Sequence, residues 1–418
     1  MRPKHIDMVL EDNHYCIQGI DIADLCKEFG SPLYVYNADK IELQVREMQK
    51  AFSGASMKIK YAVKALSNLS ILKIMKKLGV GLDVVSIQEA HLGLKAGYDP
   101  EEILFTPNSV SFKEIQEGIE LGLKINIDNI SILEQFGHLY HQKIPVCLRI
   151  NPHIMAGGHS NISTGHIDSK FGISILQMRH VHRVINTNNI RVEGLHMHTG
   201  SDILDADVFI QAAGIIFDVA KEFNDLQFID FGSGFKVAYR EGDVTTDIHS
   251  LGKKLSKSFN NFCKEYGKDL EIWFEPGKFL VSEAGYLLVR ANVVKTTPAT
   301  VFVGVDSGMN HLLRPMMYGS YHDILNLSNP DGTFRVYSVV GNICETDTLG
   351  ADRKLNEVRE GDILAIKNAG AYGFTMSSNY NSRFRPAEVL LLNGKALLIR
   401  RRETLDDLLS TMVETELD

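Results

Sequence analysis

Lys64 stands between small apolar residues, in the stretch Tyr61-Ala62-Val63-Lys64-Ala65. An ammonium group among apolar neighbours is partly desolvated, which favours the neutral amine and frees it to attack an aldehyde carbon. A lysine that extends into solvent would give the same local pattern. Reactive side chains elsewhere in the chain must therefore decide between the two interpretations.

Two histidines, His196 and His198, lie two residues apart in a run typical of a strand, so their side chains share one face. Such a pair could bind a metal ion, but no third ligand is evident from the sequence, and we predict no metal site. We expect the flat imidazole of His198 to stack on a flat cofactor ring. A hydrogen-bonded core histidine is the alternative interpretation.

A turn with two glycines, Gly232 and Gly234, follows another strand-like run. Glycines let backbone N–H groups close around an anion, so this turn is suited to a phosphate. Turns of this composition are common, and the pattern has little specificity on its own.

The stretch 275–278 reads Glu275-Pro276-Gly277-Lys278. Its carboxylate suits a positive partner such as a protonated pyridine nitrogen, and its lysine suits a phosphate. The alternative is a local ion pair beside a Pro-Gly turn.

The C-terminal third of the chain carries further polar groups amid apolar runs. The guanidinium of Arg314 offers a fork for a carboxylate, while Cys344 and Glu345 offer a proton donor and a partner for an ammonium group. Tyr372 and the stretch 377–381 add a polar, glycine-flanked region. Each could also be an ordinary turn or surface residue.

Eight strand-like runs alternate with helical periodicity between residues 57 and 275, which predicts an α/β fold with a closed (β/α)8, TIM-like barrel. An open doubly wound sheet is the competing arrangement, and the count of eight favours the barrel. Reactive groups of such barrels lie at the C-terminal strand ends, where Lys64, His198 and Glu275 fall. The predicted strands are 57–64, 79–85, 103–106, 123–127, 145–151, 192–198, 227–232 and 271–275.

After about residue 280 the pattern changes to strand-like runs joined by turn signals such as Asn393-Gly394. We predict a mostly antiparallel β domain over 281–418, a cofactor-binding barrel over 32–280, and an N-terminal segment 1–31 that joins the β domain. The predicted strands of this domain are 286–296, 301–305, 335–340, 362–366, 388–392 and 395–399.

The composition restricts the partners and the compartment. The chain has 418 residues, 44% of them hydrophobic, and a net charge of -8, which argues against nucleic acid or an anionic membrane as the main partner. The five cysteines include no Cys-x-x-Cys pair, so neither a disulfide framework nor a structural zinc site is expected. No signal-like start and no apolar run of about 18 residues is present. We therefore expect a cytoplasmic, soluble protein.

In combination, these segments resemble diaminopimelate decarboxylase, a family within the alanine-racemase-like class of pyridoxal-phosphate enzymes. The resemblance covers about Pro32 to Glu403, and its specificity comes from the order of the motifs. Two further stretches, 159–172 and 377–389, favour this family over ornithine and arginine decarboxylases. The motifs in order are Tyr-Ala-x-Lys-Ala, His-x-His-x-Gly-Ser, Gly-x-Gly, Glu-Pro-Gly, Cys-Glu-x-x-Asp and Gly-Ala-Tyr.

The resemblance implies that Lys64 holds pyridoxal 5'-phosphate as a Schiff base, that His198 stacks on its ring and that Glu275 pairs with its nitrogen. It also implies that Cys344 donates a proton in a homodimer with shared active sites, serving the site of the partner. The implied reaction converts meso-2,6-diaminopimelate to L-lysine and CO2. The remaining implied contacts are Ser201, Gly232, Gly234, Gly277, Lys278 and Tyr372 with the cofactor, and Arg314, Tyr318, Glu345 and Tyr372 with the substrate.

The chain also departs from the family pattern. Lys278 stands where arginine is usual, and a lysine keeps the charge but loses the bidentate fork. Ser233, Thr199 and Asp202 differ from the common residues near the glycine turns. The alternatives are a decarboxylase of ornithine, arginine or a carboxylated polyamine, a racemase of the same fold, and a non-catalytic cofactor carrier.

Overall fold

The computed structural model describes residues 6–154, 169–198, 200 and 204–417, and the chain divides into two compact units. We call residues 44–238 and 244–279 the barrel unit, and residues 1–43, 239–243 and 280–418 the β unit. The sequence placed the start of the barrel at residue 32, whereas residues 32–43 make their contacts in the β unit.

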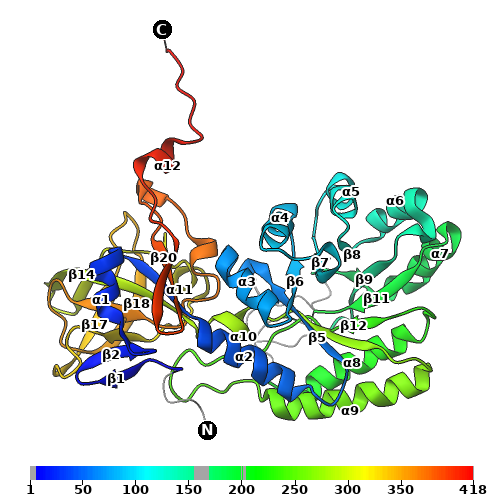
Figure 1. Ribbon diagram of the computed structural model, residues 1–418, viewed down its shortest axis with the longest axis horizontal. Helices are drawn as coiled ribbons and strands as arrows, with labels where there is room; N and C mark the ends of the chain where they lie inside the picture. Colours follow the sequence, from blue (N-terminus) through cyan, green and yellow to red (C-terminus); the bar gives the residue numbers. More distant parts are fainter. Residues whose placement is uncertain (1–5, 155–168, 199, 201–203, 418) are drawn as a thin grey trace. The chain divides into compact units, whose positions relative to one another are not determined.

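The described part of the barrel unit contains eight parallel strands that close on themselves (Figure 1). Each strand pairs with the next along the chain, and the circle closes where β13 pairs with β5. This confirms the predicted barrel and excludes the open sheet. The strands are β5 (Met57–Ala62), β6 (Gly81–Val84), β7 (Ile103–Phe105), β8 (Lys124–Ile127), β9 (Val146–Asn151), β11 (Val192–His196), β12 (Phe228–Asp230) and β13 (Glu271–Phe274), and a short β10 (Ile173–Ser174) pairs with β9.

Helices follow the strands and surround the barrel, as the alternating sequence pattern predicts. Helix α4 illustrates how they begin: the Ser86 hydroxyl accepts the N–H of Glu89, and the Glu89 carboxylate accepts the N–H of Val85. This capping fixes the turn that follows β6. The helices are α3 (Leu69–Lys77), α4 (Ile87–Lys95), α5 (Phe112–Glu120), α6 (Ile130–Tyr140), α7 (Met178–Asn188), α8 (Ala206–Ala220) and α9 (Ile248–Tyr266), while α2 (Ala38–Ala51) and α10 (Lys278–Val281) span the division between the units.

An apolar layer fills part of the barrel interior. Its members are Leu104, Cys147, Phe228 and Trp273, all buried. The rings of Phe228 and Trp273 stack with centroids 3.6 Å apart. Because this layer lies one strand pleat before Asp230 and Glu275, it closes the interior beneath the C-terminal strand ends and leaves those ends for a site.

The β unit is built on a sheet with the strand order β18-β17-β15-β14-β4-β20-β21. Most of its pairings are antiparallel, as predicted, but β4 runs parallel to β20 and β15 parallel to β17. Strand β19 pairs with β14, and β16 pairs with β19. These strands are β4 (Leu33–Asn37), β14 (Gly285–Thr296), β15 (Val301–Val305), β16 (Ile324–Asn326), β17 (Phe334–Val340), β18 (Thr348–Asn356), β19 (Ile363–Ile366), β20 (Ala387–Leu392) and β21 (Lys395–Arg400).

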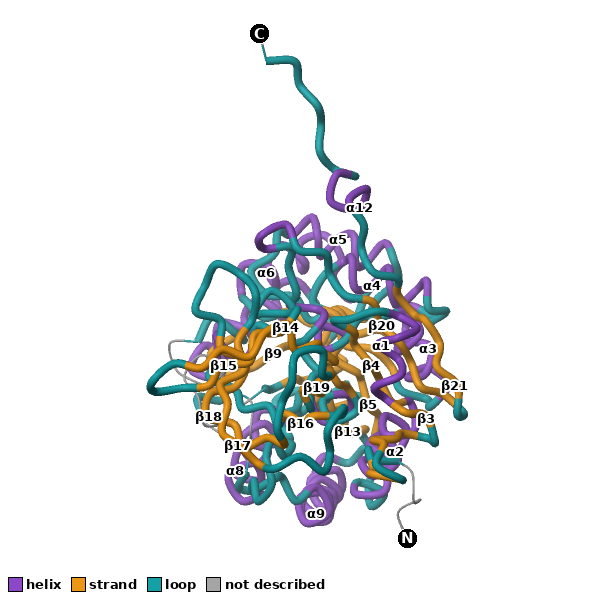
Figure 2. The backbone as a smooth tube through the Cα atoms, turned by 90° about the vertical axis from the view of Figure 1, so that its left-hand side faces the viewer, coloured by secondary structure: helices purple, strands orange, loops and turns teal. Residues whose placement is uncertain are grey.

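The N-terminal segment belongs to the β unit and covers one face of this sheet. Its apolar side chains pack against Leu33, Leu288 and Val389, all of them fully buried. Helix α12 and the residues after it lead away from the strands of the unit (Figures 1 and 2). The remaining elements are β1 (Val9–Glu11), β2 (His14–Ile17), β3 (Ile20–Asp21), α1 (Ile22–Phe29), α11 (Arg314–Tyr318) and α12 (Leu405–Leu409).

Candidate active site

Lys64 lies in a single 3-10 turn (Val63–Ala65) directly after β5, at the C-terminal end of the barrel. Its Nζ is 3.5 Å from Oδ2 of Asp83, which lies on β6. The side chain of Lys64 is 45% exposed and that of Asp83 only 1%. Burial and the nearby Glu275 together raise the pKa of Asp83 from 3.8 to about 6, although Lys64 opposes the rise. An amine that reaches solvent therefore stands over a buried acid.

Glu275 directly follows β13 and interacts with both Asp83 and Lys64, so it belongs to the same cluster. Burial raises the pKa of Glu275, and the positive charges of Lys64 and Arg149 lower it. Its Oε2 is 3.2 Å from Nε2 of His196. Asp83 and Thr106 approach the carboxylate, but its buried Oε1 has no hydrogen-bond partner among the described residues.

A buried oxygen without a partner costs free energy, of the order of 1–3 kcal/mol. The cost is recovered when a donor such as a protonated ring nitrogen binds to that oxygen. The structure thus brings Lys64 and Glu275 together, as we expected from the sequence. It leaves Oε1 of Glu275 as an acceptor without a donor among the described residues.

The two histidines differ in their surroundings. His196 is fully buried, and its Nδ1 accepts a hydrogen bond from the Asn126 amide at 2.8 Å, so the neutral ring carries its proton on Nε2, towards Glu275. His198 accepts the N–H of Ser233 on Nδ1 at 3.2 Å. Burial lowers the pKa of both histidines well below 6.5, which keeps His198 neutral and suits it to stacking.

The sequence showed no third metal ligand, but the fold supplies candidates from other strands. One ligand atom from each of His196, Asp230 and Glu275 lies within 4.8 Å of the others. Burial raises the pKa of Asp230 well above 3.8 and lowers the pKa of His196 well below 6.5, so it favours the uncharged forms of both groups. The absence of a metal site stays a prediction.

The glycine turn after β12 packs against His198. A Cβ on Gly232 would lie 2.5 Å from Nδ1 of His198, and Gly232 has a φ of 62°, so both space and backbone conformation require glycine. The N–H of Gly232 donates to Oδ1 of Asp230. Since the N–H of Ser233 also has a partner, a phosphate would bind this turn through its remaining amide groups.

The segment 275–278 is hydrogen-bonded to β5, the strand that leads into the turn of Lys64. The N–H of Ala62 donates to the carbonyl oxygen of Pro276 at 3.2 Å, and the N–H of Glu275 donates to that of Gly232 at 2.6 Å. Gly277 and Lys278, where α10 begins, therefore lie beside the same strand ends. Ser201, with Thr199 and Asp202, lies outside the described residues, as does most of the stretch 159–172.

Two buried residues of this cluster escaped the sequence analysis. Arg149 on β9 is 8% exposed; burial lowers its pKa, and the acids Glu275, Asp128 and Asp83 oppose this. Asp83 is the other. Each stands in a short and mostly apolar strand, and only the period-2 alternation towards the barrel interior could have marked them.

In the β unit, Arg314 lies among three tyrosine rings. Its guanidinium carbon is 5.7 Å from the ring centroid of Tyr318, 5.8 Å from that of Tyr372 and 5.6 Å from that of Tyr239. It donates to the Ser320 hydroxyl at 3.2 Å. The structure thus brings together Arg314, Tyr318 and Tyr372, and adds Tyr239, which the sequence analysis missed because it is distant in the chain.

Cys344 and Glu345 form a second cluster in the β unit, with Tyr380 and Asn381. The Tyr380 hydroxyl donates to Glu345 Oε1 at 2.8 Å, and the Asn381 amide donates to the Cys344 sulfur at 3.1 Å. Both partners come from the polar stretch noted in the sequence, whose function was not assigned there.

Comparisons with known proteins agree with this geometry. Residues 38–282 match the family model of the pyridoxal-dependent decarboxylase, pyridoxal binding domain. The diaminopimelate decarboxylase of Methanothermobacter thermautotrophicus is 40% identical over 411 residues, covering 96% of both chains. The chain belongs to the diaminopimelate decarboxylase family.

Solved structures of the diaminopimelate decarboxylase family show the same fold. The structure from Methanocaldococcus jannaschii has a TM-score of 0.89 at 32% identity, and the match covers 98% of both chains. That of Helicobacter pylori, complexed with L-lysine, has a TM-score of 0.84 at 34% identity, covering 93% of this chain and 98% of that one. The predicted family, fold and class of pyridoxal-dependent decarboxylase are confirmed. In the described part of the chain, no helix is long and apolar enough to cross a membrane.

Proposed function

We propose that this protein decarboxylates meso-2,6-diaminopimelate to L-lysine and CO2 with pyridoxal 5'-phosphate at the barrel mouth. The observation that carries the proposal is the cluster of Lys64, Asp83 and Glu275 at the ends of β5, β6 and β13. It combines an amine that reaches solvent with a buried carboxylate whose Oε1 has no partner among the described residues. This is the pair of groups that the cofactor's aldehyde and ring nitrogen require.

When bound, pyridoxal phosphate supplies an aldehyde for amino groups and a ring that takes up the electron pair left by departing CO2. Lys64 would hold the cofactor through its aldehyde. Glu275 would pair with the protonated ring nitrogen, which would stabilise the charge that develops during the reaction. His198 would stack on the ring as a neutral imidazole.

The phosphate is assigned to a set of backbone and side-chain donors around the glycine turn and α10. Lys278 supplies the positive charge there as a single ammonium group, without the fork of an arginine. The assigned residues are Ser201, Gly232, Gly234, Gly277 and Lys278, with Tyr372 as a further contact to the cofactor.

The substrate carries an ammonium and a carboxylate at its distal end, and the β unit offers a partner for each. Arg314, with Tyr318 and Tyr372 around it, would bind the carboxylate, and Glu345 the ammonium group. Cys344 would return a proton to Cα after CO2 leaves. We further propose a homodimer in which Cys344 and Glu345 serve the site of the partner.

The experiment compares substrates and one variant. The wild type should release CO2 and form lysine from meso-diaminopimelate, and be much slower with ornithine and arginine. Borohydride treatment with pyridoxal phosphate should attach a pyridoxyl group at Lys64, found by peptide mass spectrometry. Lys64→Ala should lose both the label and at least about a thousandfold of the activity.

Lys58→Ala is a matched control, because Lys58 lies on β5, the strand that leads into the turn of Lys64, is 55% exposed and pairs with Glu271. It should retain activity. Normal turnover by Lys64→Ala would overturn the assignment of the lysine, and ornithine as the preferred substrate would overturn the assignment of the reaction.

A further inference from the structure

Two side chains of the loop between β19 and β20, Tyr380 and Asn381, contact the Cys344 sulfur. Asn381 makes two contacts with Cys344: its Oδ1 accepts the backbone N–H at 2.9 Å, and its Nδ2 donates to Sγ at 3.1 Å. The first contact fixes the amide orientation, because only the oxygen can accept a hydrogen bond from N–H. The nitrogen must then face the sulfur.

The backbone of Asn381 supports this placement. It has a φ of 54°, in the left-handed region that asparagine adopts more readily than most residues. Replacing Asn381 by alanine would therefore both strain the backbone at this position and remove the amide that donates to the sulfur.

Tyr380 contacts the same sulfur from another direction. Its Oη is 2.8 Å from Glu345 Oε1 and 3.4 Å from Cys344 Sγ. The hydroxyl has one proton to give, and the carboxylate is an acceptor only, so the hydroxyl donates to Glu345 while the thiol donates to the hydroxyl. A thiolate would compete with Glu345 for that proton.

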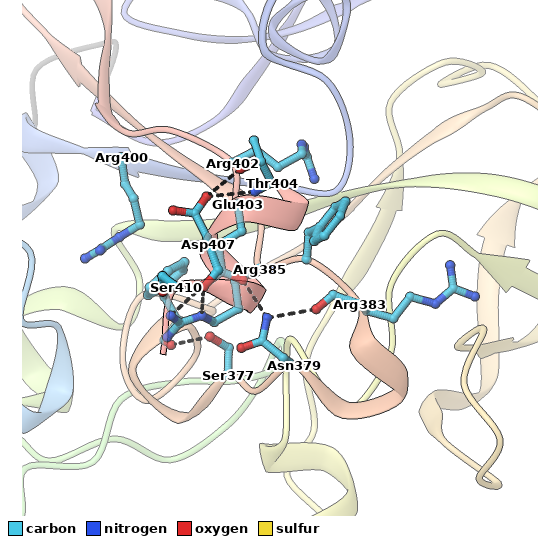
Figure 3. A network of polar contacts seen from close by, with 12 residues as sticks. Ser377, Asn379, Arg383, Arg385, Arg400, Arg402, Glu403, Thr404, Asp407 and Ser410 are labelled. Atoms are coloured by element: carbon cyan, nitrogen blue, oxygen red, sulfur yellow. Dashed lines mark hydrogen bonds and ion pairs between the residues drawn. The ribbon is translucent and has the colours of Figure 1, made fainter. Parts of the chain in front are cut away.

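The loop itself is anchored by ion pairs and hydrogen bonds away from the sulfur (Figure 3). The Glu403 carboxylate accepts from the Arg385 guanidinium and from the Arg385 backbone N–H at 2.8 Å. It also accepts from the Asn379 amide, which in turn donates to the carbonyl oxygen of Arg383. Arg383 donates to the carbonyl oxygen of Asn342, two residues before Cys344. These contacts keep Tyr380 and Asn381 in position.

We propose that Asn381 and Tyr380 are positioning residues that hold the Cys344 thiol and stabilise the thiolate it leaves after donating its proton. The inference rests on the proposed role of Cys344 in the reaction. Donation by Tyr380 and Asn381 to the thiolate lowers the pKa of the Cys344 thiol, and desolvation and the charge of Glu345 oppose this. The direction agrees with the contacts.

The proton step balances as follows. The S–H bond breaks, its electron pair stays on sulfur, and a C–H bond forms at Cα. The Tyr380 hydroxyl then turns its hydrogen bond from Glu345 to the thiolate, beside the donor of Asn381. A proton from solvent restores the thiol, so one proton is consumed for each CO2 released, as the overall reaction requires.

The test measures the Cys344 thiol directly in the full-length protein. All five cysteines are described, and the other four are buried, so iodoacetamide should alkylate Cys344 first; the site is checked by peptide mass spectrometry. The rate is followed from pH 6 to 10 in the wild type, Asn381→Ala and Tyr380→Phe. Both variants should shift the profile to higher pH, and react about three- to tenfold more slowly at pH 7, since each loses a donor to the thiolate.

Activity gives a second readout. In both variants kcat for CO2 release should fall more than KM changes, because the lost contacts act on the proton donor. Tyr140→Phe, a tyrosine of helix α6 in the barrel unit, is the matched control and should leave both the alkylation profile and kcat unchanged.

Two outcomes separate this inference from the proposed function. If the profiles of Asn381→Ala and Tyr380→Phe coincide with that of the wild type while CO2 is released normally, the inference is wrong and the function stands. If the profiles shift but no substrate is decarboxylated, the positioning of the thiol stands and the proposed function fails. Tyr380→Phe removes one oxygen only, so it keeps the test decisive should Asn381→Ala not fold.

Discussion

Three acids at the barrel mouth lie out of contact with solvent, and burial is the largest cause of the raised pKa of each. They are Asp83, Asp230 and Glu275. Lys64 and Arg149 offset part of this for Glu275. A cationic ring nitrogen would therefore bind to groups that are otherwise costly to ionise, and its binding should be coupled to proton release from the cluster.

Replacing the carboxylate of Glu275 by an amide separates catalysis from folding. Glu275→Gln keeps the shape but removes the charge that pairs with the ring nitrogen, so kcat for CO2 release should fall about 100- to 1,000-fold. Thermal unfolding should stay unchanged or move to higher temperature, because a buried charge is removed. Glu271→Gln, at the other end of β13, is the control and should remain active. Wild-type kcat in Glu275→Gln would contradict the assigned pairing.

Asp83 predicts a pH dependence of stability. Burial raises its pKa from 3.8 in the unfolded chain to about 6 in the folded protein. The folded state therefore binds this proton more tightly, and the resulting stabilisation is full below about pH 4 and lost as the pH rises through 6. The difference between the two pKa values corresponds to roughly 3 kcal/mol.

Asp83→Asn removes this titration. The free energy of urea unfolding should rise by about 1–3 kcal/mol at pH 7.5, and by about a third as much at pH 4.5, where only the unfolded chain has lost most of this proton. Asp225→Asn, at a side chain 71% exposed, should show no such difference between the two pH values. Parallel pH profiles for Asp83→Asn and the wild type would refute the assignment.

At the residue scale, the sequence revealed groups that stand in motifs and missed groups that stand alone. Lys64 and Glu275 were predicted because each belongs to a patterned stretch at a strand end. Asp83, Arg149 and Asn126 reach the same cluster from three different strands, and one polar residue in a short apolar run carries no chemical signal. Their role follows from barrel closure, which brings the strands together.

At the scale of elements, the eight barrel strands were predictable because each is an apolar run between helices. Strand β18 was not, because its central residues are largely exposed and charged, as in Ala351-Asp352-Arg353-Lys354, so it shows neither an apolar run nor a regular alternation. Strand β16 spans only Ile324–Asn326 and is too short to show a period.

A glycine within strand β11 determines how tightly the barrel interior packs. The Cα of Gly194 pairs with that of Phe228, and a Cβ at Gly194 would lie 2.3 Å from the Phe228 ring. That ring is stacked on Trp273 and is buried, so it has little room to move. A methyl group at this position must displace the stacked pair or the strand.

Gly194→Ala should therefore lower the free energy of unfolding by about 1–3 kcal/mol. Urea unfolding followed by fluorescence reports on the site directly, because Trp273 is the one tryptophan of the chain. Gly214→Ala is the matched control: no atom lies within 4 Å of its Cβ position, and alanine in helix α8 should stabilise by up to about 1 kcal/mol. Equal unfolding midpoints for the two variants would show that the interior yields without cost.

At the scale of the whole molecule, the sequence predicted two domains but placed their boundary differently. Residues 33–37 form a fully buried strand, and a continuous apolar run reads the same in a barrel as in a β domain. Only the register, in which β4 pairs with β14 and β20, assigns it to the β unit. The assigned cofactor-binding residues other than Tyr372 lie in the barrel unit, and the assigned substrate-binding residues in the β unit.

This division allows the proposed sharing of sites between subunits to be tested by mixing variants. Lys64→Ala lacks the lysine of the barrel unit, and Cys344→Ala lacks the thiol of the β unit, so each homodimer should be nearly inactive. If Cys344 serves the partner, a mixed dimer contains one intact site and one site with both defects. Random exchange makes half of the dimers mixed, so activity should recover to about a quarter of that of the wild type.

The control mixes Lys64→Ala with Glu275→Gln, two variants of the same barrel unit. Every site in their mixed dimer keeps one defect, so activity should not recover, although the subunits exchange equally well. Exchange is monitored with differently tagged chains, and CO2 release is measured before and after mixing. If Lys64→Ala and Cys344→Ala exchange subunits completely and remain inactive together, then Cys344 acts within its own chain, and the proposed sharing of sites is wrong.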